Sequence, residues 1–174
     1  MNAPPASQRR ILGIDPGANA TGWAALDVHG ARLRFVEAGV IRAQRGAGRP
    51  QRLAAIHAAL LDILDRLAPD EAAVEETFVN ASPRDALVLG EARGVALAAP
   101  AGRGLPVAEY AANTIKKSVV GQGHADKKQV AMMVRVLCPA AGALAGDAAD
   151  ALAVAICHAH HAPADMLARA RRSA

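Results

Sequence analysis

The segment that most constrains the fold is residues 11–26, where two apolar runs are separated by a Pro-Gly turn. The first run ends in Asp15, and the second begins at Thr21. This pattern predicts two β-strands with a carboxylate at the end of the first. Aspartate is rare in buried strands unless it is paired or holds a cation, because removing an unpaired carboxylate from water is costly. Taken alone, Asp15 is explained equally well as a turn residue.

The size and composition of the chain fit a single domain. Its 174 residues are 52% hydrophobic, which is enough for one core. We expect an N-terminal arm over residues 1–9, one domain over 10–162 and a basic tail over 163–174. No apolar stretch approaches the ~20 residues of a membrane span, and the first residues lack a signal-peptide core. We therefore expect a cytoplasmic protein without membrane contact. Cys138 and Cys157 lack metal-binding spacing and are expected to be buried.

The rest of the chain alternates strand-like and helix-like segments. Residues 31–41 partly alternate in polarity and predict a third strand, antiparallel to the second, so that the first three strands form a meander. The fold class expected is α/β: a five-stranded mixed sheet, with this antiparallel meander plus two parallel strands, flanked by helices. The further strands are expected at 72–78 and 105–110, and the helices at 53–64, 84–99, 113–120, 127–137 and 146–157.

The strand at 72–78 repeats the feature seen at Asp15, because it too delivers acids at its end. Parallel neighbours place their carboxyl ends at the same edge of a sheet. If this strand lies beside the first, one of its acids is brought close to Asp15. We expect Glu75 to point inward because it directly follows Val74, and Glu76 to be a solvated turn residue.

Two more acids open the last predicted helix. Asp147 and Asp150 lie three residues apart, hence on one face near the helix start. Capping and the helix dipole would explain both acids without a site. Together with Asp15 and Glu75, however, they predict four carboxylates converging on one place. Four mutually repelling acids need cations, and hard oxygen ligands favour Mg²⁺ or Mn²⁺ in a pair able to support phosphodiester hydrolysis.

Basic residues follow the acidic half of the chain. Lys116, Lys117, Lys127 and Lys128 flank a glycine-containing loop at 121–125 that could admit a phosphate backbone. The glycines of this loop do not match a nucleotide-binding fingerprint, since they follow a helix rather than a strand. The sequence pI of about 9.6 permits a polyanionic partner but does not identify one.

Small residues and histidines leave several alternatives open. Gly90 and Gly94 lie one turn apart in a predicted helix, which fits either a dimer interface or packing on the sheet. We expect His57 to be a core or interface residue. The histidines at 158, 160 and 161 follow the acidic helix start by two turns or more, and we expect them to be surface or helix-end residues.

The order of these motifs resembles the RuvC family of Holliday junction resolvases, which have the ribonuclease H-like fold. The resemblance covers almost the whole chain, and five motifs in order make it specific. They occupy residues 13–17, 74–78, 89–94, 116–121 and 147–153. The family implies a structure-selective endodeoxyribonuclease, acting in homologous recombination and DNA repair, that resolves four-way junction DNA by paired symmetric nicks through metal-activated water.

The resemblance also implies roles for individual residues. Asp15, Glu75, Asp147 and Asp150 would be the catalytic metal ligands, with two Mg²⁺ or Mn²⁺ ions per subunit. Lys116 and Lys127 would contact DNA phosphates near the cut, and Phe78 would disturb base stacking at the junction centre. The family acts as a homodimer, which the helix from Arg84 onward would form, beside a RuvA/RuvB-type branch-migration complex. Glu76 departs from the family, because many relatives carry Gln there.

Two other functions are compatible with parts of the sequence. Actin-like kinases and Hsp70-type ATPases also begin with a strand, an aspartate and a glycine turn, so a nucleotide-binding switch is the main alternative. It requires a second phosphate loop and a second domain, for which 174 residues leave little room. A DNA-binding scaffold with a degenerate site is the other alternative, and the presence of all four acids argues against it.

Overall fold

The computed structural model describes residues 8–44, 46–76, 82–144 and 146–161. Five strands form one sheet in the order β3-β2-β1-β4-β5. The strands are β1 (Arg9–Asp15), β2 (Ala20–His29), β3 (Arg32–Arg42), β4 (Glu71–Glu76) and β5 (Val107–Ala111). The helices are α1 (Arg49–Leu67), α2 (Pro83–Ala101), α3 (Ala112–Val120), α4 (Lys127–Leu137), the short 3-10 helix η1 (Pro139–Ala141) and α5 (Asp147–His161).

The sheet has the mixed topology expected from the sequence. β1 and β3 both pair antiparallel with β2, which makes the predicted meander. β4 lies between β1 and β5 and is parallel to both. In the register of β1 and β4, Ile14 faces Val74. The residues that follow, Asp15 and Glu75, therefore emerge side by side at one edge of the sheet.

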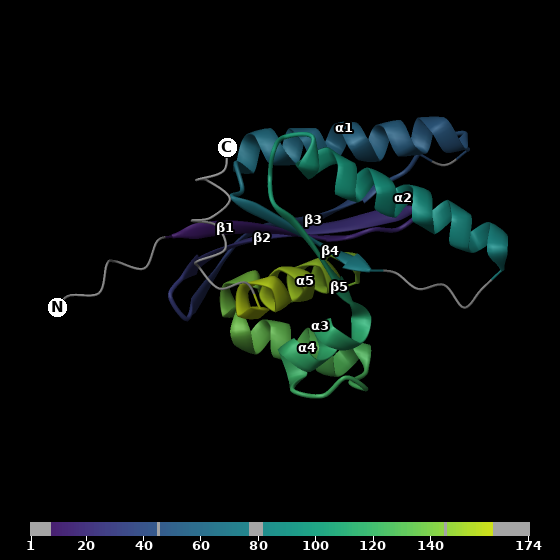
Figure 1. Cartoon of the computed structure of the whole chain (residues 1–174). Coiled ribbons are helices and arrows are strands. Elements are labelled where there is room, and N and C mark those ends of the chain that lie inside the picture. The colour runs from purple at the N-terminus through teal and green to yellow at the C-terminus, as the bar shows by residue number, and fades with distance from the viewer. Residues whose placement is uncertain (1–7, 45, 77–81, 145, 162–174) are drawn as a thin grey trace.

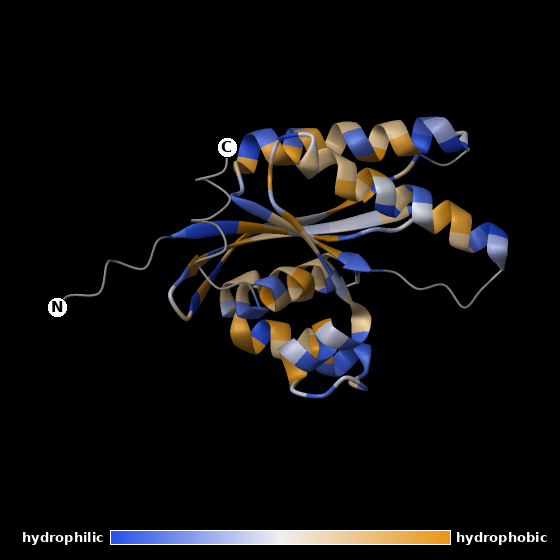
Figure 2. Cartoon of the chain, viewed as in Figure 1, coloured by the Kyte–Doolittle hydropathy of each residue, from blue (hydrophilic) through white to orange (hydrophobic). Residues whose placement is uncertain are grey.

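The molecule has helices on both faces of the sheet. α1 and α2 cover one face, α5 packs on the other, and α3 and α4 lie outside α5 (Figure 1). Each face has its own apolar core, one built with α1 and α2 and one with α3, α4 and α5. Figure 2 shows apolar residues where the strands cross the middle of the molecule. Among the described residues, no helix has the length and apolarity that crossing a membrane requires.

α5 is enclosed on nearly all sides. Between Ala148 and His158, every residue except Asp150 is buried. An apolar helix of this kind is stable only inside the protein, and here small residues on the sheet let it approach closely. A Cβ added to Gly13 would lie 2.2 Å from the carbonyl oxygen of Ala151, and one added to Gly22 would lie 2.0 Å from that of Asp147. These two glycines therefore fix how near the start of α5 comes to the end of β1.

Some positions differ from the expectation. Arg9 belongs to β1 rather than to an arm, because its guanidinium pairs with the buried Glu71. The expectation that His57 lies in the core is wrong. It is exposed because it follows Ile56 by one residue and is rotated away from the face of α1 that packs on the sheet. Cys138 and Cys157 are buried and free, as expected.

Candidate active site

The four predicted carboxylates meet where the ends of β1 and β4 face the start of α5. Asp15 ends β1, Glu75 is the penultimate residue of β4, and Asp147 and Asp150 lie in the first turn of α5. Each of the four side chains is half-buried. The spacing of i and i+3 places both α5 acids on the same side of the helix, and the glycines of β1 and β2 bring that side onto the strand ends.

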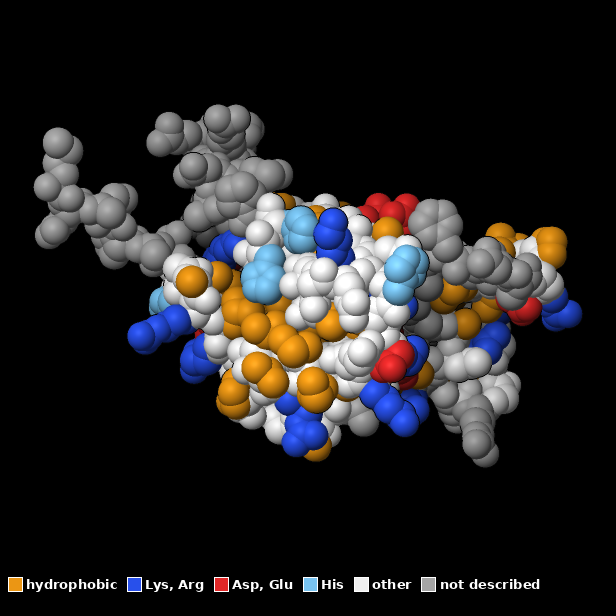
Figure 3. Space-filling model, turned by 90° about the horizontal axis from the view of Figure 1, so that it is seen from below, with side chains coloured by type: hydrophobic (Ala, Val, Ile, Leu, Met, Phe, Trp, Pro, Cys, Tyr) orange, Lys and Arg blue, Asp and Glu red, His pale blue; other side chains and the backbone are white. Residues whose placement is uncertain are grey.

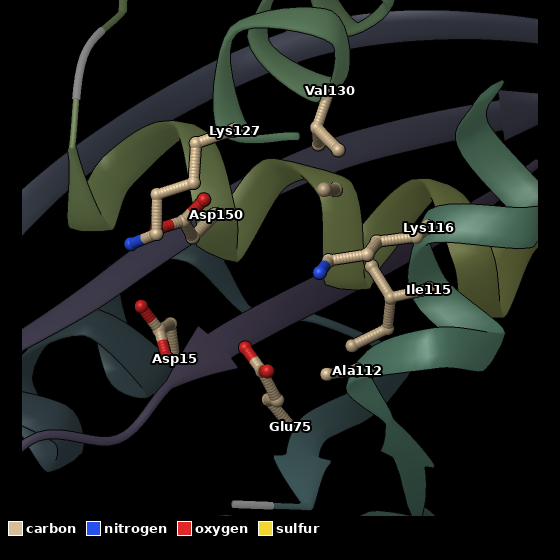
Figure 4. Close-up of a pocket in the computed structure, with 9 residues that line it drawn as sticks. Asp15, Glu75, Ala112, Ile115, Lys116, Lys127, Val130 and Asp150 are labelled. Carbon is tan, nitrogen blue, oxygen red and sulfur yellow. The ribbon is translucent and has the colours of Figure 1, made fainter. Parts of the chain in front are cut away.

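The four carboxylates form two overlapping groups, and Asp15 and Asp150 belong to both. One carboxylate oxygen from each of Asp15, Asp147 and Asp150 lies within 4.8 Å of the others. Glu75 is outside this group, but its carboxylate is close enough to help raise the pKa of Asp15. Asp15, Glu75 and Asp150 also line a pocket of about 330 Å³, toward which their side chains turn in Figure 4. Asp15 and Asp150 thus belong to both groups, whereas Asp147 belongs only to the first and Glu75 only to the second.

The electrostatics show an excess of negative charge at this place. Burial and the charges of Glu75, Asp150 and Asp147 raise the pKa of Asp15 to about 8. Burial and the charge of Asp150 likewise raise the pKa of Glu75. Carboxyl groups so arranged hold either a proton or a cation. A set of oxygen donors with this geometry and charge fits a hard divalent ion such as Mg²⁺ or Mn²⁺.

Two of the four predicted DNA-binding lysines border the pocket. Lys116 and Lys127 both line it, and Lys127 Nζ lies 3.3 Å from Asp150 Oδ2. The charge of Asp150 raises the pKa of Lys127, which keeps its ammonium group protonated. Lys117 lines a different pocket, and Lys128 is exposed and lines neither. Phe78, the predicted stacking residue, lies outside the described residues.

Glu76 turns away from this pocket. Successive residues of a strand point to opposite faces, and the Glu76 carboxylate lies 4.0 Å from the Arg93 guanidinium of α2. Arg93 also pairs with Glu109 of β5. The extra acid next to Glu75 is therefore compensated by α2 and does not line the pocket.

A buried polar network that the sequence did not reveal ties the other end of α5 to the sheet. The expectation that His158 is a surface or helix-end residue is wrong, since only 5% of it is exposed. Its Nε2 donates to Glu71 Oε2 at 2.6 Å, and its Nδ1 lies 2.9 Å from the Tyr110 hydroxyl. Burial alone would raise the pKa of Glu71, but the hydrogen bond from His158 and the charge of Arg9 hold it below its usual value. His160 and His161 are exposed, as expected.

Replacing His158 by alanine is expected to destabilise the fold by about 2 kcal/mol, because it removes two hydrogen bonds and leaves Glu71 Oε2 with only the longer bond from Arg9, at 3.3 Å. Urea unfolding followed by circular dichroism measures the effect. His160→Ala is the matched control and is expected to change stability by less than about 0.5 kcal/mol, because His160 is exposed. Equal effects of the two substitutions would contradict a stabilising role for the network.

Comparison with known proteins assigns this chain to one family. The family described as crossover junction endodeoxyribonuclease RuvC matches residues 11–158. The RuvC protein of Methylocella silvestris is 59% identical over 150 residues, covering 86% of this chain and 85% of the relative. The RuvC protein of Xanthobacter autotrophicus is 56% identical over 161 residues, covering 92% of this chain and 95% of the relative.

Solved structures agree with the sequence comparison. Thermus thermophilus RuvC in complex with a Holliday junction substrate has a TM-score of 0.80 and 34% identity, over 87% of this chain and 93% of that one. The yeast mitochondrial Holliday junction resolvase, with a TM-score of 0.65 and 16% identity over 98% of this chain and 85% of that one, shares the fold. These likenesses confirm the ribonuclease H-like fold, and the match over residues 11–158 favours the nuclease over the actin-like alternative. The chain belongs to the RuvC family of crossover junction endodeoxyribonucleases.

Proposed function

We propose that the protein is a metal-dependent endonuclease that resolves Holliday junctions by paired symmetric nicks, in homologous recombination and DNA repair. The observation that carries this proposal is the convergence of three carboxylates and two lysines on one pocket, with Asp147 close to two of these acids, in a chain that belongs to the RuvC family. The relative from Thermus thermophilus is known in complex with a Holliday junction substrate, which supports the same substrate here.

The acids and the lysines of the site have different proposed roles. Asp15, Glu75, Asp147 and Asp150 would hold the metal, and Lys116 and Lys127 would hold the phosphate by charge. A divalent cation bound here would act as a Lewis acid on the phosphate and on the attacking water. The ion pair with Asp150 keeps the Lys127 ammonium group beside the carboxylates. A phosphate that reaches Lys127 is thereby brought next to the acids.

The ligand arrangement supports two cations per subunit, either Mg²⁺ or Mn²⁺. Asp147 and Glu75 fall in different groups, because Asp147 belongs to the close group of three while Glu75 lines the pocket together with Asp15 and Asp150. One cation would be shared by Asp15, Asp147 and Asp150, and a second by Asp15 and Glu75. Asp15 is the only acid in both sets, which makes it the central ligand of this proposal.

The stabilisation of the protein by Mg²⁺ is expected to increase from pH 6 to pH 8 and then to level off. A cation must displace the proton that Asp15, with a pKa of about 8, holds in the metal-free site. With one proton displaced, the affinity rises about tenfold per pH unit below pH 8. The shift in melting temperature caused by a fixed Mg²⁺ concentration measures this effect. A shift that does not depend on pH would contradict the role of Asp15.

A homodimer is proposed through the exposed face of α2. Leu87, Gly90 and Gly94 lie on one side of this helix, and 58% of Leu87 is exposed. A Cβ added to either glycine would meet no atom within 4 Å, so within the chain these glycines are not required for packing on the sheet. Two copies of such a face can approach closely, which would place two sites on one junction for paired nicks.

Leu87→Arg is expected to convert the dimer to a monomer, because it removes an apolar contact and places a charge at the centre of the interface. The dimer dissociation constant should rise at least about 100-fold, as measured by sedimentation velocity. Met132→Arg is the matched control, since Met132 is a similarly exposed apolar residue on α4, and it should remain dimeric. A dimer that survives Leu87→Arg would exclude this face.

Two further proposals come from the resemblance: a DNA-stacking role for Phe78 and action beside a RuvA/RuvB-type branch-migration complex. Others come from the sequence pattern: DNA contacts of Lys117 and Lys128, a cytoplasmic location, and the division of the chain into an arm, a domain and a tail, with Arg9 belonging to the domain because it lies in β1.

The experiment that tests the proposed function is a cleavage assay with a labelled four-way junction and a plain duplex of the same sequence, in Mg²⁺ and in Mn²⁺. We expect symmetric nicks in the junction and none in the duplex. Equal cleavage of both substrates would contradict the proposed selectivity for junctions. The absence of cleavage in both metals would overturn the proposed endonuclease activity.

A further inference from the structure

A second pocket lies on the side of α3 that faces away from the carboxylates. It has a volume of about 610 Å³ and is formed by α3, the loop before α4 and the end of α5. The residues that line it are Asn113, Thr114, Lys117, Ser118, Gly123, His124 and His161. None of them lines the carboxylate pocket, so this is a separate site.

α3 separates the two pockets and sends one lysine into each. Neighbouring residues of a helix are rotated by about 100° around its axis. Lys116 lines the carboxylate pocket, and Lys117 lines the second pocket. Because α3 is only nine residues long and the lysines are adjacent in sequence, the two pockets are neighbours on the surface.

The lining of the second pocket suits an anion. Lys117 supplies a positive charge, and the amide, hydroxyl and imidazole groups around it can donate hydrogen bonds. Among the described residues, no carboxylate lines the pocket. Figure 3 shows the face of the molecule seen from below, where histidine side chains and a basic side chain lie together. His161 Nδ1 donates to the Cys157 carbonyl oxygen at 2.9 Å, so its Nε2 can donate to an anion only when the ring carries a second proton.

We propose that the second pocket binds a backbone phosphate of the junction DNA, distinct from the phosphate that is cut. This inference rests on the proposed function and adds a second point at which the same DNA is held. The site favours a phosphate of a DNA strand over a free nucleotide, because it neighbours the carboxylate pocket, where the proposed function already places a DNA strand. A strand that passes Lys116 can continue past α3 to Lys117, so one DNA segment contacts both pockets.

The test combines protein variants with junctions that carry one uncharged methylphosphonate at a defined position. Binding is measured by fluorescence anisotropy in Ca²⁺, over a range of salt concentrations. Lys117→Gln and His124→Gln are the two test variants, Lys116→Gln reports on the carboxylate pocket, and Arg32→Gln is the control. Arg32 is an exposed residue in the β2–β3 hairpin, at the opposite end of the sheet from the carboxylates.

We expect Lys117→Gln to weaken junction binding about tenfold and to reduce the salt slope by about one ion. One methylphosphonate position should weaken the wild type but leave Lys117→Gln unaffected, because the contact is already lost. Lys116→Gln should remain sensitive at that position, Arg32→Gln should behave as the wild type, and His124→Gln should show a smaller loss at the same position as Lys117→Gln.

The inference is overturned if Lys117→Gln and His124→Gln both keep the wild-type sensitivity at every position. If the wild type still cuts the junction in that case, the proposed function stands and only the second pocket is lost. A wild type that neither binds nor cuts the junction would overturn both. Circular dichroism and melting temperature show that each variant is folded.

Discussion

Asp15→Asn is expected to abolish cleavage of a four-way junction while leaving junction binding intact. Asparagine keeps the size of the side chain but removes the charge that the two proposed cations share, so the loss should be at least about 10³-fold. This exceeds the 10- to 100-fold that removing even an outer-shell partner of a metal typically costs. Binding persists because Lys116 and Lys127, which would hold the phosphate, are unchanged. Single-turnover cleavage and anisotropy measure the two quantities separately.

The same variant has a second signature in metal-free buffer. The folded protein raises the pKa of Asp15 from 3.8 to about 8, so the stabilising contribution of its proton is complete below pH 4 and is lost as the pH rises through 8. Asp15→Asn removes the buried charge. It should therefore be more stable than the wild type at pH 8.5, and the difference should shrink toward pH 4. Chemical unfolding at both pH values measures it.

Glu76→Gln is the matched control for Asp15→Asn. It also converts an acid to an amide next to the site, but its carboxylate faces Arg93 and lies outside the pocket. Its cleavage rate should stay within about threefold of the wild type, in keeping with the small effects of exposed substitutions. Full activity of Asp15→Asn, or equal losses in the two variants, would show that cleavage does not depend on the arrangement described above.

Gly13→Ala is expected to destabilise the protein by at least about 3 kcal/mol, the upper end of overpacking costs. The new methyl group would lie 2.2 Å from the carbonyl oxygen of Ala151 and 2.8 Å from the Cβ of Ala155. Both atoms belong to α5, which cannot yield easily because α3 and α4 enclose it. Either the fold loses stability or α5 moves outward and carries Asp150 away from Asp15.

Thermal unfolding detects the first outcome and the cleavage assay the second, and either one supports the close approach of α5 to β1. Gly123→Ala is the control, because its Cβ would meet only ordinary contacts, the nearest at 3.5 Å, and should change stability little. Wild-type stability together with wild-type cleavage in Gly13→Ala would show that the close approach of α5 to β1 is not required for the site.

Local patterns predicted much of the site. Asp15 and Glu75 each follow an apolar strand, and the parallel pairing of β1 with β4 needed only the rule that parallel strands share an edge. Asp147 and Asp150 were placed together by helical spacing alone. The proposed roles of these acids depend on how they lie together, and no single segment of the sequence determines that arrangement.

Long-range packing explains what the sequence did not reveal. α5 is buried on nearly all sides, so the periodicity of its apolar residues gave no indication of which way His158 points. Glu71 is buried with partners 62 and 87 positions away in sequence, Arg9 and His158. The close packing of Gly13 against α5 depends on the same tertiary contact. A pattern confined to one segment cannot predict these pairings. The acid Glu71 at the start of a buried strand did, however, indicate that this carboxylate needs a partner.

The measurement that tests the central claim most directly is a calorimetric titration of the metal-free protein with Mn²⁺ at pH 7. Wild type should bind Mn²⁺ and release about one proton per subunit, since the metal displaces the proton held by Asp15. Asp15→Asn should lose this binding, and Glu76→Gln should keep it. Undiminished Mn²⁺ binding by Asp15→Asn, with the same proton release as the wild type, would contradict a metal site centred on Asp15.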